Sequence, residues 1–307
     1  MNKILLINSL FLFCINCFLV SPKEKKSEKE IQNLINIINA NEILSRLGKK
    51  NRVNFFSSDI GKLEIQILYQ NGSEPFTEKI SPMNAQEVVP WQILEENLTT
   101  VFSHRKQSIQ LDIPKTLDEM IPIPHRNKTL WSLEEIENLI LQNANTNEIP
   151  QVGKIYICFL NGNFQENGSR KSNTAGINIV GTSYIAIFPK VIHPDGKING
   201  NLTHLFKEQS TVIHEIGHVI GLVNNGIPPT SNHEDYTHRL HCSNQFCVMY
   251  WANTSSFNIG KILSNFIQNG SLQFFHQECL NDIRNFTINR IEYYQRSVFN
   301  FTLKYLE

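Results

Sequence analysis

The sequence lacks any excess of one charge, since its 28 Lys and Arg residues equal its 28 Asp and Glu residues. It has no basic patch of the kind that binds a phosphate backbone, which sets nucleic-acid binding aside. It also lacks a long apolar run: the stretch 4–13, near the N-terminus, is too short for a membrane span. The hydrophobic fraction of 41% still allows a sizeable core, and the length suits one domain of about 220 residues with extensions.

The N-terminal residues have the pattern of an export signal. A lysine precedes the short apolar run 4–13, and we expect residues 1–20 to be a signal peptide. Cys17 stands where a lipoprotein is cleaved, so lipid attachment to a membrane and simple secretion both stay open. Residues 21–61 then form a charged tether and an N-terminal helical extension. We expect an exported protein that is secreted, periplasmic or lipid-anchored at the cell surface.

The most specific motif is residues 214–221, which read His-Glu-Ile-Gly-His-Val-Ile-Gly. On a helix, His214 and His218 lie on one face, one turn apart. Two neutral imidazoles so placed can bind one Zn²⁺ ion. Glu215 can then lie beside the metal without coordinating it, which is the position of a general base for a zinc-bound water.

The context of this motif predicts a helix. Residues 205–220 contain no proline and have an apolar face. Gly217 inside the helix costs about 1 kcal/mol relative to alanine, which indicates that another part of the chain approaches closely there. Gly221 suits a left-handed C-terminal cap.

A zinc ion held by two histidines needs a third protein ligand and one open position. Asn224 has the closest metalloprotease spacing, but an amide is a poor zinc ligand beside imidazole. The remaining candidates are His233, His238 and His241. The residues themselves leave all three open, and the segment that follows His241 makes it the first candidate, with His233 second and His238 third.

The motif and a downstream methionine together resemble the metzincin zinc peptidases. The segment 241–249, His-Cys-x₄-Cys-Val-Met, is similar to the archaemetzincin branch. This resemblance implies His241 as the third ligand and Met249 as the methionine of a tight turn under the metal. Between Gly221 and His241 the chain carries an insertion, as the leishmanolysin-like branch also does. Residues 62–284 more broadly resemble secreted, lipoprotein-like bacterial metalloproteases.

The expected fold is α+β: a twisted mixed sheet, an active-site helix with the motif, and a mostly helical C-terminal part. The catalytic domain would span 62–284, followed by a C-terminal helical extension, 285–307. Hydrophobic patterns and a capping box at Ser132 predict strands at 63–69, 154–160 and 182–188, and helices at 91–102 and 133–143.

The strand before the motif helix has a second expected role. In the metzincin fold this strand is an exposed edge, so the resemblance implies that a substrate peptide pairs with Tyr184, Ile185 and Ala186. The alternative is that these residues form only a core strand.

Four cysteines remain after the signal region: Cys158, Cys242, Cys247 and Cys279. In an exported protein disulfides are the default. The archaemetzincin resemblance implies another arrangement, a second, structural zinc at Cys242, Cys247, Cys279 and His276, where the histidine replaces a family cysteine. Because no cysteine lies between residues 18 and 157, a cysteine switch in a propeptide is excluded.

The function that the sequence predicts is zinc-dependent endopeptidase activity on a peptide or protein substrate, with Glu215 activating a zinc-bound water. We expect a monomer. One alternative is a non-catalytic zinc-binding surface protein with four protein ligands on the metal. Another is a zinc hydrolase that acts on something other than peptides.

Overall fold

The computed structural model describes residues 54–81, 87–124, 127–254 and 259–289. The chain divides into two units, Met1–Arg46 and Leu47–Glu307, and all described residues belong to the second unit. The expected signal peptide, most of the tether and most of the C-terminal extension therefore lie outside the described residues. Among the described helices, none is both long enough and apolar enough to cross a membrane.

The centre of the main sheet consists of three parallel strands: β1 (Lys62–Gln70), β5 (Val152–Phe159) and β9 (Tyr184–Ile187). All three fall where the hydrophobic patterns predict strands. The strands β1 and β5 pair in continuous register, from Lys62 opposite Val152 to Tyr69 opposite Phe159. The strand β5 lies between the other two.

Short strands complete this sheet on both sides, in the order β2-β1-β5-β9-β8. On the outer side of β1, β2 (Gln110–Asp112) and β3 (Ile121–Ile123) pair with its two ends. Beside β9, β8 (Gly176–Asn178) runs antiparallel. The expectation that Tyr184, Ile185 and Ala186 form an exposed edge is therefore wrong, because β8 covers that side and is itself the edge strand.

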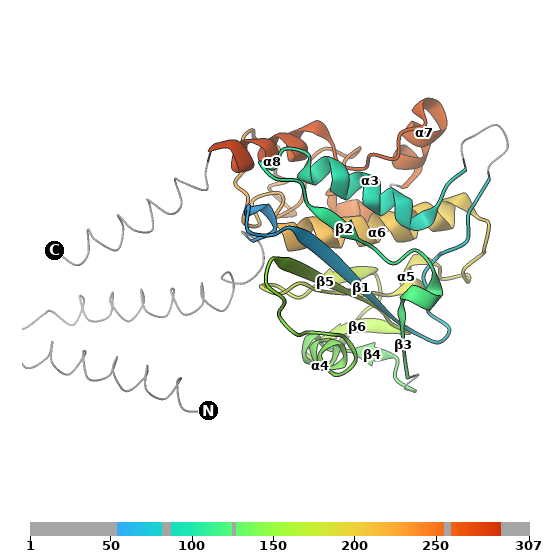
Figure 1. Cartoon of the computed structure of the whole chain (residues 1–307). Coiled ribbons are helices and arrows are strands. Elements are labelled where there is room, and N and C mark those ends of the chain that lie inside the picture. Colours follow the sequence, from blue (N-terminus) through green and yellow to red (C-terminus); the bar gives the residue numbers. More distant parts are fainter. Residues whose placement is uncertain (1–53, 82–86, 125–126, 255–258, 290–307) are drawn as a thin grey trace, which may run out of the picture. The chain divides into compact units, whose positions relative to one another are not determined.

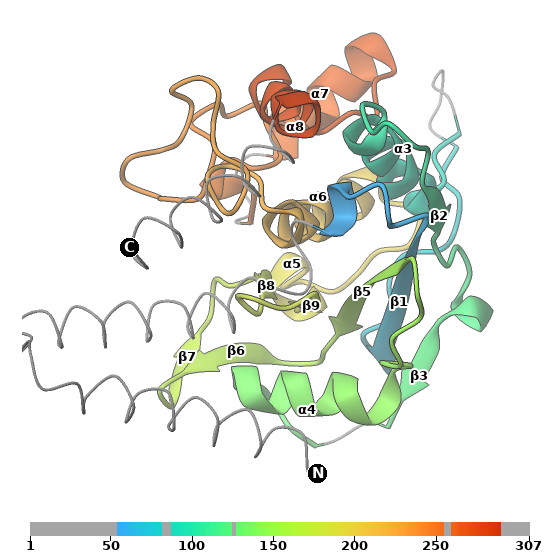
Figure 2. The same ribbon diagram turned by 60° about the vertical axis from the view of Figure 1, so that its left-hand side comes forward.

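Helices cover both faces of the sheet (Figure 1). On one face lie α3 (Pro90–Phe102) and α6 (Leu202–Ile220), and on the other lies α4 (Leu133–Asn143), as Figure 2 also shows. The side chains of β5 alternate between the two layers, with Ile157 packed in the core under α3 and α6 and Cys158 in the core under α4. Burial on both faces explains why this strand is almost continuously apolar.

The helices begin where the local sequence predicts. The N-cap of α4 is Ser132, whose hydroxyl accepts the N–H of Glu135, while the Glu135 carboxylate accepts the N–H of Ser132. This capping box satisfies donors that the first helical turn leaves unpaired. Helix α3 begins at Pro90, which suits a first-turn position because proline has no N–H to satisfy.

The remaining elements surround this core. A small second sheet contains β4 (Leu130–Trp131), β6 (Asn163–Glu166) and β7 (Ser169–Lys171). Short helical turns occur at Asn54–Phe56 (η1), Leu117–Glu119 (η2), Pro189–Ile192 (α5) and Trp251–Thr254 (η3), and the described part ends with α7 (Ile259–Asn269) and α8 (Gln277–Asn289). The part of the chain that is described is thus a mixed α+β unit with a helical C-terminal portion.

The core extends beyond the expected domain limits of 62–284. Phe56 lies before the first limit and Phe286 beyond the second, inside α8, yet their ring centroids are 6.0 Å apart.

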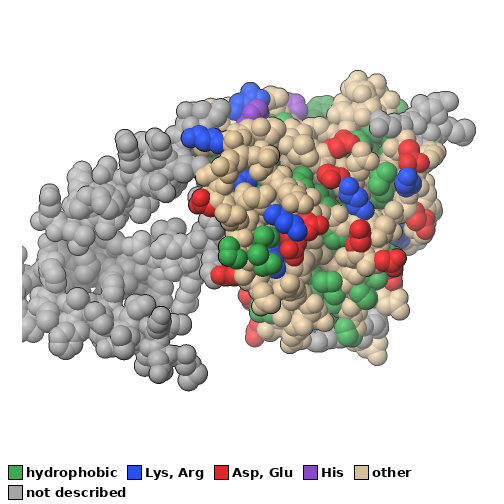
Figure 3. Space-filling view, in the orientation of Figure 1, with side chains coloured by type: hydrophobic (Ala, Val, Ile, Leu, Met, Phe, Trp, Pro, Cys, Tyr) green, Lys and Arg blue, Asp and Glu red, His purple; other side chains and the backbone are tan. Residues whose placement is uncertain are grey.

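On the surface, acidic and basic side chains are interspersed over the face shown in Figure 3, and neither sign gathers there.

Candidate metal centres

Helix α6 carries the histidine motif and has capping residues at both ends. Asn201 caps its start, with the side-chain oxygen accepting the N–H of His204 at 3.1 Å. Gly221 ends it in the left-handed conformation, with φ of 96°, and Leu222 donates back to the Gly217 carbonyl. The helix therefore stops directly after the motif and frees the chain to turn back toward the histidines.

The structure brings His214, His218 and His241 together, with their ligand atoms all within 4.8 Å of one another. The Nε2 atoms of His214 and His218 are 3.0 Å apart. Two nitrogen ligands at 2.0–2.1 Å on a tetrahedral ion would be roughly 3.3 Å apart. The geometry of the group is therefore close to that of a tri-histidine metal site.

Backbone carbonyls orient two of these imidazoles. The Nδ1–H of His214 donates to the Val248 carbonyl at 2.7 Å, and the Nδ1–H of His241 donates to the Arg239 carbonyl at 3.0 Å. Each hydrogen bond holds the proton on Nδ1, so the Nε2 atom of the same ring keeps a lone pair that can bind a metal. Burial lowers the pKa of His214 to about 3 and also lowers the pKa of His241, so both stay neutral, as metal binding requires.

Glu215 is buried between α6 and the edge strand β8, outside the histidine group. Burial raises the pKa of its carboxyl to about 8, although the carboxylate accepts the backbone N–H of Asn178, which acts in the opposite direction. A Cβ at Gly176 would lie 2.9 Å from Cγ of Glu215. The edge strand thus holds this carboxylate closely, and a cation bound by the histidines would favour its charged form.

Met249 packs against the motif helix. The N–H of Tyr250 donates to the Cys247 carbonyl at 3.0 Å, which closes a tight turn around Met249. A Cβ at Gly217 would overlap the sulfur of Met249. The glycine inside the helix therefore accommodates the methionine, which accounts for the close approach expected from the sequence.

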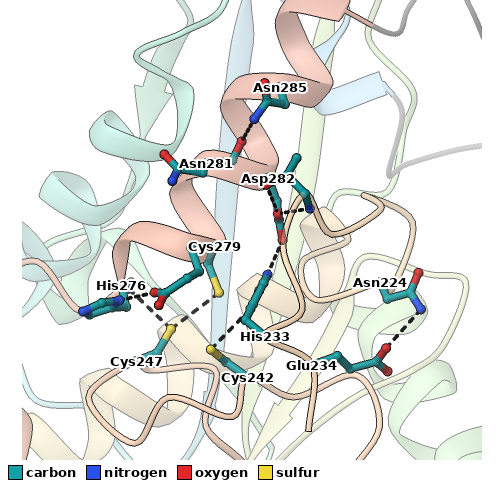
Figure 4. A network of polar contacts seen from close by, with 12 residues as sticks. Asn224, His233, Glu234, Cys242, Cys247, His276, Cys279, Asn281, Asp282 and Asn285 are labelled. Atoms are coloured by element: carbon teal, nitrogen blue, oxygen red, sulfur yellow. Dashed lines mark hydrogen bonds and ion pairs between the residues drawn. The ribbon is translucent and has the colours of Figure 1, made fainter. Parts of the chain in front are cut away.

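A second group of side chains that could hold a metal ion lies beside the first, and we call it the cysteine group. The ligand atoms of His233, Cys242 and Cys279 all lie within 4.8 Å of one another, and the sulfur of Cys247 adjoins that of Cys279 (Figure 4). The sulfur of Cys242 is 3.5 Å from Nδ1 of His233, and the sulfurs of Cys247 and Cys279 are 3.6 Å apart. None of the four cysteines among the described residues, Cys158 included, forms a disulfide, in contrast to the disulfides expected from the sequence.

Hydrogen bonds and burial shift the pKa values of the thiols in this group. Hydrogen bonds from Cys247 and Cys279 lower the pKa of Cys242, while burial of Cys247 raises its pKa. Burial also opposes a charge on His233, but hydrogen bonds with Asp282 and Cys242 outweigh it and raise the pKa of His233 to about 10.

The other candidate ligands lie elsewhere. His276 is not turned toward the sulfur atoms (Figure 4); its ring contacts Asn244 and Glu278, and its side chain is 43% exposed. Only its backbone N–H reaches the group, donating to the sulfur of Cys247. His238 stacks on Trp251 with ring centroids 3.9 Å apart. His276 therefore does not complete the cysteine group, and His238 does not join His214 and His218.

The sequence gives no sign of several partners that the structure adds. Three are backbone groups: the carbonyls of Val248 and Arg239 and the N–H of Asn178. Backbone contacts do not depend on residue type, so no pattern could reveal them. Asp282 is a different case: it is buried and bonds His233, and an acidic residue in the apolar pattern of α8 is the signal that could have found it.

Comparisons with protein families, with curated proteins and with solved structures found no match for this chain.

Proposed function

We propose that this protein is a zinc-dependent peptidase of metzincin type, with His214, His218 and His241 as the metal ligands. The observation that carries the proposal is the convergence of these three imidazoles at the helix that also carries the buried carboxylate of Glu215. Neutral imidazole nitrogens are donors that zinc favours. The turn at Met249, packed against Gly217, agrees with the same family resemblance.

The role of each group follows from its position. A zinc ion held here supplies a Lewis acid that polarises the scissile carbonyl. Glu215 takes the proton of the attacking water and passes it to the leaving amine. The N–H of Asn178 orients the Glu215 carboxylate, and the hydrogen-bonded carbonyls of Val248 and Arg239 fix the rings of His214 and His241.

A peptide substrate is the class that the neighbouring sheet favours. The edge strand β8 pairs with β9 on one side only within the described chain, and its Asn178 contacts Glu215. An extended peptide could add to this edge through main-chain hydrogen bonds. The substrate role that the sequence suggested for Tyr184–Ala186 thus moves to Gly176–Asn178.

The alternative of a closed, non-catalytic zinc site has less support. Within the described residues, the histidine group has three members and no fourth protein ligand. Both His218 and His241 are also only half-buried. A site that serves structure alone usually has four protein ligands and needs no carboxylate base.

The test is hydrolysis of an unfolded protein substrate by the wild type and by Glu215→Ala, with zinc content measured on the same samples. Loss of a general base typically costs 10²–10⁴-fold, so we expect turnover to fall about 10²-fold or more with zinc retained. Glu208→Gln is the matched control, because Glu208 is a buried glutamate on α6 outside both metal-ligand groups. Near wild-type turnover in Glu215→Ala would reject the mechanism.

A further inference from the structure

We propose that a cavity at the carboxyl ends of the central strands binds a small organic carboxylate, with Lys197 as its charged partner and His193 as a second hydrogen-bond donor. The cavity has a volume of about 650 Å³. Ligand pockets in proteins typically measure about 300–1,000 Å³. The cavity can therefore hold an organic molecule of moderate size, whereas a lone inorganic ion would leave most of it unfilled.

The cavity lies where the three parallel strands of the main sheet end. Its wall contains residues 72–78, which follow β1, Asn161, which follows β5, and parts of the segment 189–199, which follows β9. Because the loops after parallel strands meet at one edge of a sheet, this edge is where open sheets with parallel strands commonly bind their ligands. The cavity thus has the position of a ligand site in this fold.

The cavity is separate from the histidine group. The ring of His193, in the cavity wall, stacks on His204 with the ring centroids 4.6 Å apart. His204 precedes His214 by ten residues on α6, which amounts to about 15 Å along the helix axis. None of the residues that line the cavity belongs to the histidine group or to the cysteine group. The proposal therefore does not depend on the proposed peptidase activity.

His193 is buried in the cavity wall with both ring nitrogens unpaired. It is 4% exposed, and neither Nδ1 nor Nε2 has a hydrogen-bond partner among the described residues. Burial lowers the pKa of His193 to about 3, so the ring stays neutral and carries one N–H donor. A buried polar group without a partner is destabilising. This ring is therefore placed to bond a group that comes from outside the chain.

Lys197 supplies a positive charge beside the same aromatic ring. Its Nζ donates to the Glu74 carbonyl at 2.7 Å and lies 4.1 Å from the centroid of the Phe76 ring, which also contacts His193 with centroids 5.7 Å apart. Burial lowers the pKa of Lys197, although nearby carboxylates act in the opposite direction. Among the described residues Lys197 forms no ion pair closer than 4.0 Å, so two of its three N–H donors remain for an anion.

The donors match one carboxylate better than a phosphate. A full charge on Lys197 and a neutral N–H on His193 match a group with one negative charge and two acceptor oxygens. The wall also contains Glu74 and Glu78, which would repel a second negative charge. The other lysine of the wall, Lys190, is exposed on α5. We therefore assign a monoanionic carboxylate as the ligand class.

The test is isothermal titration of the full chain with sodium benzoate, and with benzamide as the neutral match of the same shape. We expect benzoate to bind the wild type and benzamide to bind about tenfold or more weakly. Lys197→Met should weaken benzoate binding about 10–100-fold, as loss of a hydrogen bond to a charged group does. Lys106→Met, at an exposed lysine outside the cavity, is the matched control. Equal binding of benzamide, or an equal loss in both variants, would overturn the proposal.

His193→Phe tests the second donor. Phenylalanine keeps an aromatic ring against His204 and Phe76 and removes both unpaired nitrogens, so urea unfolding without ligand should show no loss of stability. Benzoate should bind this variant about 2–10-fold more weakly, as loss of a neutral hydrogen bond implies. Unchanged affinity, or a marked loss of stability, would overturn the role given to His193.

Two further arms identify the source of the carboxylate. Benzoate represents a free small molecule and N-acetylphenylalanine represents the carboxyl end of a peptide. Binding of either supports the proposal, and the tighter of the two identifies the source. Inorganic phosphate that binds more tightly than both would overturn the carboxylate class, and so would a wild type that binds neither.

A last variant excludes the metal as the binding partner, because carboxylate oxygens also bind zinc. His218→Ala removes a ligand of the histidine group but leaves the cavity intact, so it should keep its affinity for benzoate. Retained affinity there, with loss in Lys197→Met, separates this site from the proposed function. Loss of benzoate binding in His218→Ala, with none in Lys197→Met, would place benzoate at the histidine group and overturn the proposal.

Discussion

The two metal-ligand groups meet at consecutive residues, His241 and Cys242, yet they differ in composition, burial and closure. The histidine group has three like donors, two of them half-buried, beside a carboxylate that does not join it. The cysteine group has four donors of two kinds, all buried. Three protein donors would leave one position of a tetrahedral zinc open, whereas a fully buried group leaves no room for a reacting molecule.

Gly176→Ala should have the largest effect of the variants compared here, and the effect should be on turnover at the histidine group only. The added Cβ would lie 2.9 Å from Glu215 Cγ and 2.9 Å from Thr211 Cγ2, so the carboxylate must shift. A displacement of this kind can cost about 10²-fold in turnover while the metal stays bound. Peptidase assays and metal content measure this, with Gly61→Ala, whose Cβ meets nothing within 4 Å, as the control. Equal activity in both variants would mean that the position of Glu215 does not matter.

The sequence predicts the histidine group far better than the cysteine group. The spacing of His214, Glu215 and His218 has a direct meaning on a helix, and the structure also brings His241 to them. His233 could not be assigned in this way, because main-chain pairing of the insertion with residues 241–243 places it. Chain folding through an irregular segment leaves no periodic signal.

The strands of the main sheet also differ in how well the sequence predicts them. The three central strands β1, β5 and β9 are largely buried and are evident from the apolar runs in which they lie. The edge strand β8 has only three residues, Gly-Ile-Asn, which is too short for a hydrophobic pattern. The resemblance implied an exposed edge at Tyr184–Ala186, and no pattern in the sequence indicated that β8 covers it.

Gly217→Ala should affect stability more than chemistry. A Cβ there would overlap Met249 sulfur and approach Phe275 to 3.4 Å. Overpacking a well-filled core typically costs about 1–3 kcal/mol, so we expect the free energy of unfolding to fall by that amount. Urea unfolding measures it, with Gly260→Ala in α7 as a helical control that meets nothing within 4 Å. Equal stability of the two variants would show that Met249 does not pack as described.

Glu208→Gln should have no effect on either centre, and its effect on stability should be smaller than that of Gly217→Ala. Its carboxylate accepts the N–H of Phe76 at 2.6 Å, and burial raises its pKa from 4.5 to about 7. Because the folded state holds this proton more tightly than the unfolded chain, stability is lost as pH rises through 7.

For the wild type, this loss should amount to about 2 kcal/mol between pH 5 and pH 7. The glutamine variant should lose this part of the pH dependence and keep its turnover. Unfolding curves at several pH values measure the difference. Identical pH profiles for the two proteins would contradict the assignment of a protonated Glu208, and lost turnover would disqualify it as the control for Glu215.

The most direct test of the central claim is the anomalous-scattering map of crystals grown with zinc. The account predicts one zinc bound by Nε2 of His214, His218 and His241, with Glu215 outside the coordination shell and no fourth protein ligand. A zinc on His214 and His218 that is completed by His233 or His238, or closed by a fourth side chain, would contradict it.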